Sequence, residues 1–265
     1  MNDNIFESKR EIRDILDIYK HDLIEIYEPK FNVSYYRLYQ KFLSDFENLL
    51  TKYNHKSKVL DVGCAQGNFT EILVKLGFNV TAIDINPNYV KYTKEKIQGH
   101  NQKVEVECFN VYDFDRPGEY DIIFAGEVIE HVKNPEQFLS HLTRQLKKDG
   151  ILILTTPNQK YYRNKLPSFS QVDLNDAVEF FPDGDGHIFL YKPSEIEKLI
   201  TKVSGLSQVK TVFYRSLFLC GDLKLRKLHR FIPEKIHFLM ETFIQKTPIS
   251  SKFFSQMLFI IKKNG

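Results

Sequence analysis

Residues 58–70 read Lys-Val-Leu-Asp-Val-Gly-Cys-Ala-Gln-Gly-Asn-Phe-Thr, and this stretch decides the fold. Apolar residues run into Asp61, and Gly63 and Gly67 then frame a turn before a helical pattern begins. A strand, a glycine turn and a helix in this order form the unit at which open α/β sheets bind nucleosides. Because glycine has no side chain, a ligand can approach the bare backbone of such a turn. The stretch therefore predicts a nucleoside pocket.

A second strand over residues 79–84 ends in Asp84, whose carboxylate could accept two hydrogen bonds from a ribose diol. The Gly-x-x-x-Gly spacing differs from the Gly-x-Gly-x-x-Gly that surrounds a pyrophosphate in dinucleotide folds. No lysine or arginine lies between residues 59 and 74, and Asp61 would repel a phosphate. We therefore expect a ligand with a ribose, a positive centre and no phosphate, which describes S-adenosylmethionine.

Five stretches within residues 57–206 resemble, in their order, the class I S-adenosylmethionine-dependent methyltransferases, and especially the O-methyltransferases of ubiquinone biosynthesis. They are Asp61–Gly67, Ala82–Pro87, Phe109–Phe114 with Tyr120–Phe124, Glu127–Val132, and Leu146–Asn158. The resemblance implies S-adenosylmethionine as cofactor. It implies cofactor contacts from Asp61, Gly63, Cys64, Gly67, Asp84, Ile85, Asn110, Val111 and Glu127. Asn110 stands where the family often has Asp, and its side-chain carbonyl could still accept from the adenine amino group.

The alternation of strand and helix patterns predicts an α/β fold with helices on both faces of a mostly parallel sheet. The resemblance implies a seven-stranded Rossmann-like sheet with an antiparallel last strand. The expected strands are 58–62, 79–84, 103–109, 120–125, 151–155, 206–214 and 253–262. Pro29 and Asn32 should break the N-terminal helical pattern. Asn86 before Pro87 and Asn134 before Pro135 predict two helix starts, and we expect Gly150 to end the second of these helices. We divide the chain into an N-terminal helical cap (1–52) and a methyltransferase domain (53–265). Within the domain we expect a substrate lid at 157–192 and a helical insertion at 217–246.

Glu127, Glu130 and His131 follow the fourth strand at a spacing that predicts one shared helical face beside the methyl donor. His187 lies in the expected lid. In one interpretation His131 or His187 is a general base and Glu130 orients the imidazole. In the other, Glu127, Glu130, His131 and His187 bind a divalent metal that acidifies the acceptor hydroxyl. A purely structural role is the third alternative.

Two families with a Glu-x-x-Glu-His stretch suggest the metal. One is the ubiquinone group, and the other comprises RNA 2′-O-methyltransferases, which place a metal on the ribose hydroxyls. The RNA enzymes show two His residues after the lid, whereas this chain shows one clear candidate. The expected lid is also acidic, through Asp173, Asp176, Glu179, Asp183 and Asp185. We therefore disfavour a nucleic acid as the acceptor.

Charge and aromatic content limit the partners. Residues 205–265 contain 11 Lys plus Arg against 3 Asp plus Glu, so this region is basic and could contact a membrane surface peripherally. Aromatic residues in the expected lid favour a small-molecule or glycan-type acceptor, with a quinone or lipid as a close variant. Three cysteines without a pairing pattern and a charged start predict a cytoplasmic protein. The oligomeric state is left open.

Overall fold

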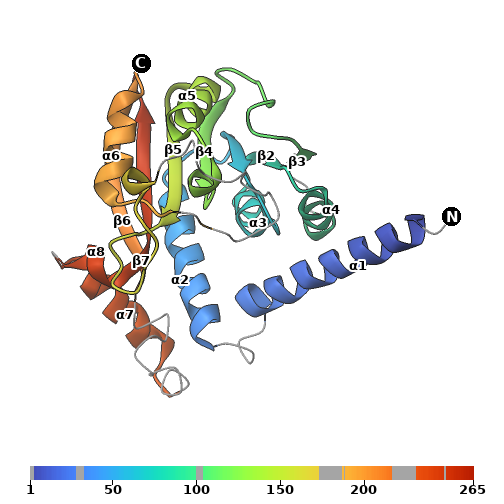
Figure 1. The fold of residues 1–265 in the computed structure, drawn as a ribbon, viewed down its shortest axis with the longest axis horizontal. Helices are drawn as coiled ribbons and strands as arrows, with labels where there is room; N and C mark the ends of the chain where they lie inside the picture. The colour runs from blue at the N-terminus through green and yellow to red at the C-terminus, as the bar shows by residue number, and fades with distance from the viewer. Residues whose placement is uncertain are drawn as a thin grey trace.

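Seven strands in the described part of the chain form one sheet in the order β3-β2-β1-β4-β5-β7-β6 (Figure 1). The residues that the computed structural model of the protein describes are 3–27, 33–99, 104–172, 187, 189–216, 231–247 and 249–265, with only the backbone given for 3–12, 25 and 33–35. The strands are β1 (Lys58–Val62), β2 (Asn79–Asp84), β3 (Val104–Cys108), β4 (Tyr120–Gly126), β5 (Leu146–Pro157), β6 (Leu206–Ser216) and β7 (Phe254–Lys263).

The strand directions confirm the expected fold class. The first five strands pair in parallel, and β7 runs antiparallel between β5 and β6. The central strands are apolar on both faces, as the full burial of the adjacent Val59 and Leu60 in two different cores shows. Parallel strands covered on both faces read as continuous apolar runs because helices pack on each side.

Helices cover both faces of this sheet (Figure 1). On one face Phe138 of α5 and Ile196 of α6 join a core with Leu60 and Leu152 of the strands. On the other face the α2 and α3 side chains pack against alternate strand positions. The helices are α2 (Val33–Leu50), α3 (Asn68–Lys75), α4 (Pro87–Lys96), α5 (Pro135–Gln145) and α6 (Pro193–Lys202). The side-chain alternation of each strand therefore serves two separate cores.

The N-terminal cap is helical, as expected. It consists of α1 (Asp3–Asp22), a π-helical turn (Leu23–Tyr27) and α2, and the expected break at Pro29 and Asn32 lies outside the described residues. A buried ion pair fixes the cap, because Lys96 Nζ lies 2.9 Å from a carboxylate oxygen of Asp22. The cap is thereby held against α4, next to the glycine turn.

Two helix starts follow the sequence signals, and one helix end does not. The side chains of Asn86 and Asn134 cap α4 and α5, and a proline follows each of them. The interpretation that α5 continues to Gly150 is wrong, since the helix ends at Gln145. Leu146 pairs with Tyr120 of β4, so the chain joins the sheet earlier than the glycine suggests.

The expected lid and insertion are described only in part. Within 157–192 there is a short helical turn (Phe169–Gln171), and residues 173–186 and 188 lie outside the described set. Within 217–246 the structure describes α7 (Glu234–Gln245), followed by α8 (Ser250–Phe253), and omits residues 217–230. Among the described helices none combines the length and apolarity that crossing a bilayer requires.

Candidate active site

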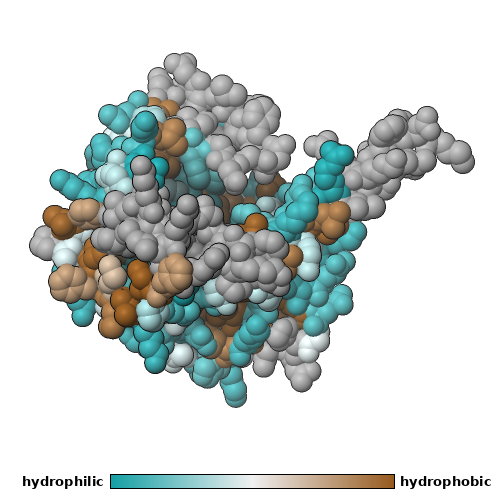
Figure 2. Space-filling view, turned by 90° about the horizontal axis from the view of Figure 1, so that it is seen from below, coloured by the Kyte–Doolittle hydropathy of each residue, from teal (hydrophilic) through white to brown (hydrophobic). Residues whose placement is uncertain are grey.

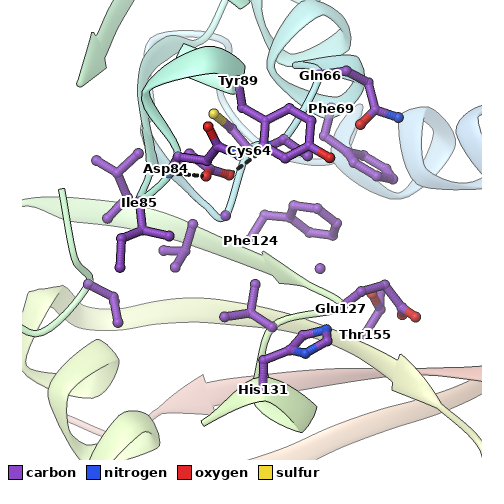
Figure 3. Close-up of a pocket in the computed structure, with 18 of the residues that line it drawn as sticks. Cys64, Gln66, Phe69, Asp84, Ile85, Tyr89, Phe124, Glu127, His131 and Thr155 are labelled. Carbon is purple, nitrogen blue, oxygen red and sulfur yellow. Dashed lines mark hydrogen bonds between the residues drawn. The ribbon is translucent and has the colours of Figure 1, made fainter. Parts of the chain in front are cut away.

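A cleft of about 1450 Å³ opens where β1, β2 and β4 end at their carboxyl edges (Figure 3). Open α/β sheets bind ligands at this edge, because the strand order reverses there and leaves a crevice. Residues of the first two turns form one wall, and residues after β4 form the wall opposite. Figure 3 shows Asp84 on the first wall and His131 on the second, with Phe124 between them.

The turn after β1 requires glycine at both predicted positions. Gly63 has a φ of 68°, and a Cβ added to it would lie 2.6 Å from Cγ2 of Val128. Gly67 has a φ of 74°, and its Cβ would lie 2.6 Å from Cγ2 of Thr93 on α4. L-residues rarely adopt this left-handed conformation. Gly63 lines the cleft, whereas Gly67 lets α4 pack against the turn.

Asp84 lines the cleft at the end of β2, as predicted. Its two carboxylate oxygens accept hydrogen bonds from the backbone N–H groups of Ala65, at 2.9 Å, and Asn86, at 2.8 Å. Burial raises the pKa of Asp84, and the hydrogen bonds to the backbone oppose that rise. Each oxygen keeps a lone pair for a further donor, so the carboxylate fits a ribose diol. Ile85 follows it, half exposed on the same wall.

Asp61 lies behind the turn and does not line the cleft. It is almost fully buried, and its carboxylate accepts a hydrogen bond of 2.6 Å from the hydroxyl of Thr70. Burial raises its pKa to about 7. The side chain therefore ties the end of β1 to α3, and its predicted direct contact with the cofactor stays a prediction.

The end of β3 supplies the third part of this wall. Asn110 and Val111, which follow β3, line the cleft, as does Cys64 in the turn after β1. The side-chain carbonyl of Asn110 accepts a 3.1 Å hydrogen bond from the backbone N–H of Tyr112, and this bond stabilises the turn that follows β3. One lone pair of that oxygen is left for an adenine amino group.

The prediction that Glu127, Glu130 and His131 share one helical face is wrong. Glu127 adopts a left-handed backbone with a φ of 56°, and only Ile129–His131 form a single 3-10 turn. Glu127 therefore turns toward β5 and β6, where the Tyr214 hydroxyl lies 3.5 Å from its Oε1 (Figure 3 shows it beside Thr155). Burial, and then the charge of Glu130, raise the pKa of Glu127.

Glu130, His131 and His187 come together as one potential ligand set. One ligand atom from each lies within 4.8 Å of the others, and Glu127 does not belong to this group. The two imidazole rings stack with centroids 4.9 Å apart. Glu130 is fully buried, and its Oε2 accepts a 3.0 Å hydrogen bond from the Thr156 hydroxyl, while its Oε1 receives none from the residues that the structure describes. A carboxylate and two imidazoles with one unsatisfied oxygen fit a small divalent cation.

Some residues of the cleft wall lie outside every motif that the sequence analysis identifies. Tyr214 and Arg215 of β6 and Gln256 of β7 reach it through the antiparallel end of the sheet. Asp14, Asp17 and His21 reach it from α1. Hydrophobic spacing identifies α1 as a helix but carries no signal for which of its polar residues face the cleft.

Comparisons with known proteins agree with this geometry. Residues 35–208 match a methyltransferase domain family. Ubiquinone biosynthesis O-methyltransferase of Rickettsia typhi is 33% identical over 159 residues, covering 58% of this chain and 63% of the relative. The same enzyme of Rickettsia bellii is 34% identical over 173 residues, covering 63% and 70%. The chain thus spans slightly under two thirds of the length of the first of these relatives.

Solved structures share the fold at low sequence identity. Magnesium protoporphyrin IX methyltransferase from Synechocystis, with bound SAH (S-adenosylhomocysteine), superposes with a TM-score of 0.58 at 14% identity, covering 94% of both chains. A methyltransferase structure from Listeria monocytogenes gives 0.56 at 13% identity, covering 85% of this chain and 99% of that one.

Proposed function

Since this chain belongs to the class I S-adenosylmethionine-dependent methyltransferases, we propose that it methylates a hydroxyl oxygen of a small acceptor bound beside His131. The relatives that support oxygen as the methylated atom are the O-methyltransferases of ubiquinone biosynthesis. The observation that carries the proposal is the position of His131, across the cleft from Asp84 (Figure 3).

The two walls have separate tasks in this proposal. Asp84 holds the ribose, and the glycine turn leaves room for the nucleoside beside the protein backbone. When bound, S-adenosylmethionine supplies an electrophilic methyl group on a sulfonium that is already a good leaving group. The protein therefore has to orient the acceptor and take up its proton, and an imidazole titrates in the range that suits this task.

The backbone and the neighbours of His131 support that role. The backbone N–H of His131 donates a 2.9 Å hydrogen bond to the backbone carbonyl of Val128, and this bond fixes the turn at the cleft. Its ring stacks on His187, and the buried Glu130 lies behind both rings. A carboxylate close to an imidazole stabilises the imidazolium that forms when the proton is accepted.

The lining favours a small acceptor with aromatic or sugar character. Phe42, Phe69 and Phe124 line the cleft, and aromatic side chains pack well on aromatic rings and on sugars. A quinone or lipid acceptor is a close variant. Asp14 and Asp17 also line the cleft, and carboxylates there would repel an RNA backbone, so we disfavour RNA ends.

Product detection tests the proposal. The purified chain is incubated with methyl-labelled S-adenosylmethionine and either phenols, sugars or fractionated extract. We expect label in an O-methyl ether. The His131→Gln variant should lose roughly a hundredfold or more of the turnover and keep its affinity for SAH. Exposed His55 provides the matched control, and His55→Gln should retain full turnover. Full turnover of His131→Gln would contradict the assigned role.

The unsatisfied Oε1 of Glu130 supports a second candidate, in which the transfer is metal-assisted. Glu130, His131 and His187 would hold the cation, which would acidify the acceptor hydroxyl. Elemental analysis after dialysis against Mg²⁺, Mn²⁺ or Zn²⁺ should then show bound metal. A chelator should abolish turnover, and added metal should restore it. Turnover that a chelator leaves unchanged would contradict this candidate and leave imidazole as the base.

A further inference from the structure

Helix α7 presents its apolar side chains to solvent. Ile236, Leu239, Met240 and Phe243 recur at intervals of three and four residues, so they form one stripe along the helix. All four are exposed, Leu239 at 70% and Phe243 at 73% of their surface. Phe231, before the helix, and Ile249, after it, are exposed as well. We call these six residues the α7 face.

On the opposite side of α7 the fully buried residues, His237 and Glu241, are polar, and Phe238 and Ile244 are partly buried. Glu241 accepts a 3.1 Å hydrogen bond from the backbone N–H of Ser216 at the end of β6. His237 is buried, and its Nδ1 lies 3.2 Å from a guanidinium nitrogen of Arg37 on α2. Arg37 also donates a 2.7 Å hydrogen bond to the carbonyl of Ile232. The helix is therefore fixed to the domain by hydrogen bonds.

This arrangement reverses the usual one. A helix on the surface of a soluble domain normally turns its apolar stripe toward the core and its polar side toward water. Contiguous apolar surface that remains exposed marks a contact with another phase or partner. Figure 2 shows apolar side chains gathered at the left of the molecule, in the region where α7 and α8 lie in Figure 1. Within the described residues, none of the six side chains of the α7 face is buried.

The charged residues beside the α7 face indicate which kind of partner this face would bind. Lys235 and Lys246, both exposed, lie along one edge of the α7 face. The sequence of residues 205–265 carries a net charge of +8, from 11 basic and 3 acidic residues. Apolar side chains edged by lysine are the composition of helices that lie in the plane of an anionic membrane surface. In an antiparallel twofold pairing of two copies, the two lysine edges would lie on the same side and repel each other.

We propose that the α7 face docks the protein on an anionic lipid surface. The apolar side chains would enter the boundary between headgroups and acyl chains, and Lys235 and Lys246 would contact lipid phosphates. Ser216, whose backbone N–H donates to Glu241 of α7, directly follows Arg215 of the cleft wall. Docking would thus bring the cleft close to the lipid, whatever the acceptor is.

Co-sedimentation with vesicles tests this proposal on the full chain. We expect binding to phosphatidylcholine vesicles that contain phosphatidylglycerol, and much weaker binding to phosphatidylcholine alone. The Leu239→Ser/Phe243→Ser double variant should reduce the partition coefficient roughly tenfold or more, because both side chains would leave the acyl boundary. Lys235→Glu/Lys246→Glu should weaken binding to the anionic vesicles.

Val209 provides the matched control, since it is an exposed apolar residue on β6, outside the α7 face. Val209→Ser should bind vesicles like the wild type. Calorimetry with SAH separates this proposal from the proposed function, because every variant should retain cofactor affinity. The proposal is overturned if the wild type ignores anionic vesicles, or if Leu239→Ser/Phe243→Ser binds them equally well. Sedimentation showing a dimer that this double variant abolishes would assign the face to a second copy instead.

Discussion

The Nε2 atom of His187 lies 3.7 Å from Oε1 of Glu130, a buried carboxylate oxygen that receives no hydrogen bond within the described part of the chain. Two segments far apart in the sequence thus meet at one unsatisfied acceptor. In both candidate mechanisms this negative charge is essential, either to stabilise an imidazolium or to bind a cation.

We therefore predict that Glu130→Gln lowers turnover roughly a hundredfold, since an amide keeps the shape but not the charge. Glu130 does not line the cleft, so calorimetry should show unchanged affinity for SAH. Glu136, an exposed partner of Lys202, is the control residue, and Glu136→Gln should behave like the wild type. Full turnover of Glu130→Gln would show that the buried carboxylate is merely structural.

Gly63 and Gly118 allow backbone strain to be separated from steric contact. Their φ angles are 68° and 66°, but an added Cβ would meet Val128 at Gly63 and, among the described residues, no atom within 4 Å at Gly118. We predict that each alanine variant loses about 1 kcal/mol of unfolding free energy to strain. Gly63→Ala alone should also lose SAH affinity, roughly tenfold or more, because Val128 lines the cleft. Equal SAH affinity in the two variants would show that Gly63 does not contribute to the cofactor site.

The sequence predicts the nucleoside wall of the cleft well because that wall is local. The strand bounds 58–62 and 79–84 are confirmed, and Gly63 and Asp84 each lie where their strand ends. Backbone geometry at the end of a parallel strand depends on few neighbours. The turn residues in the sequence therefore predict this backbone geometry directly.

The acceptor wall depends on tertiary contacts and was harder to predict. The spacing of Glu127 and Glu130 indicates a helix, but the left-handed backbone at Glu127 separates the two side chains. Arg215 and Gln256 reach the cleft because β7 inserts between β5 and β6, and this strand order leaves no local pattern. The polar buried side of α7 also escapes prediction, since hydrophobic spacing assigns the apolar side to the core.

The buried pair of Asp22 and Lys96 should control how firmly the N-terminal cap is held. Their side chains are 1% and 7% exposed, and Tyr92 donates a 2.8 Å hydrogen bond to the same carboxylate. Asp22→Ala leaves a buried ammonium short of its main partner, so we predict a loss of roughly 3 kcal/mol in unfolding free energy. Limited proteolysis should also cut the cap faster.

The exposed pair of Lys58 and Glu119 is the control for that experiment. Solvent screens such pairs, and Glu119→Ala should cost less than about 1 kcal/mol. If urea unfolding gave the two variants the same stability, Asp22 would not be an anchor of the cap.

Glu241 should make the stability of the protein depend on pH. Burial raises its pKa to about 7 from an ordinary value of 4.5, although the backbone N–H of Ser216 and the charge of Lys41 act in the opposite direction. The folded protein thus binds this proton more tightly than the unfolded chain. The contribution of Glu241 to stability is complete below pH 4.5 and is lost as the pH rises through 7.

We therefore predict that Glu241→Gln flattens the fall in unfolding free energy between pH 5 and pH 8. Since one pKa unit is worth about 1.4 kcal/mol, the variant should gain at most roughly 3 kcal/mol over the wild type at pH 8. Its side-chain oxygen can still accept from Ser216, so both proteins should be similar near pH 5. Urea unfolding at the two pH values measures the difference, with Glu234→Gln on the exposed start of α7 as the control. An identical pH slope in Glu241→Gln and wild type would show that this carboxyl group ionises normally in the folded protein.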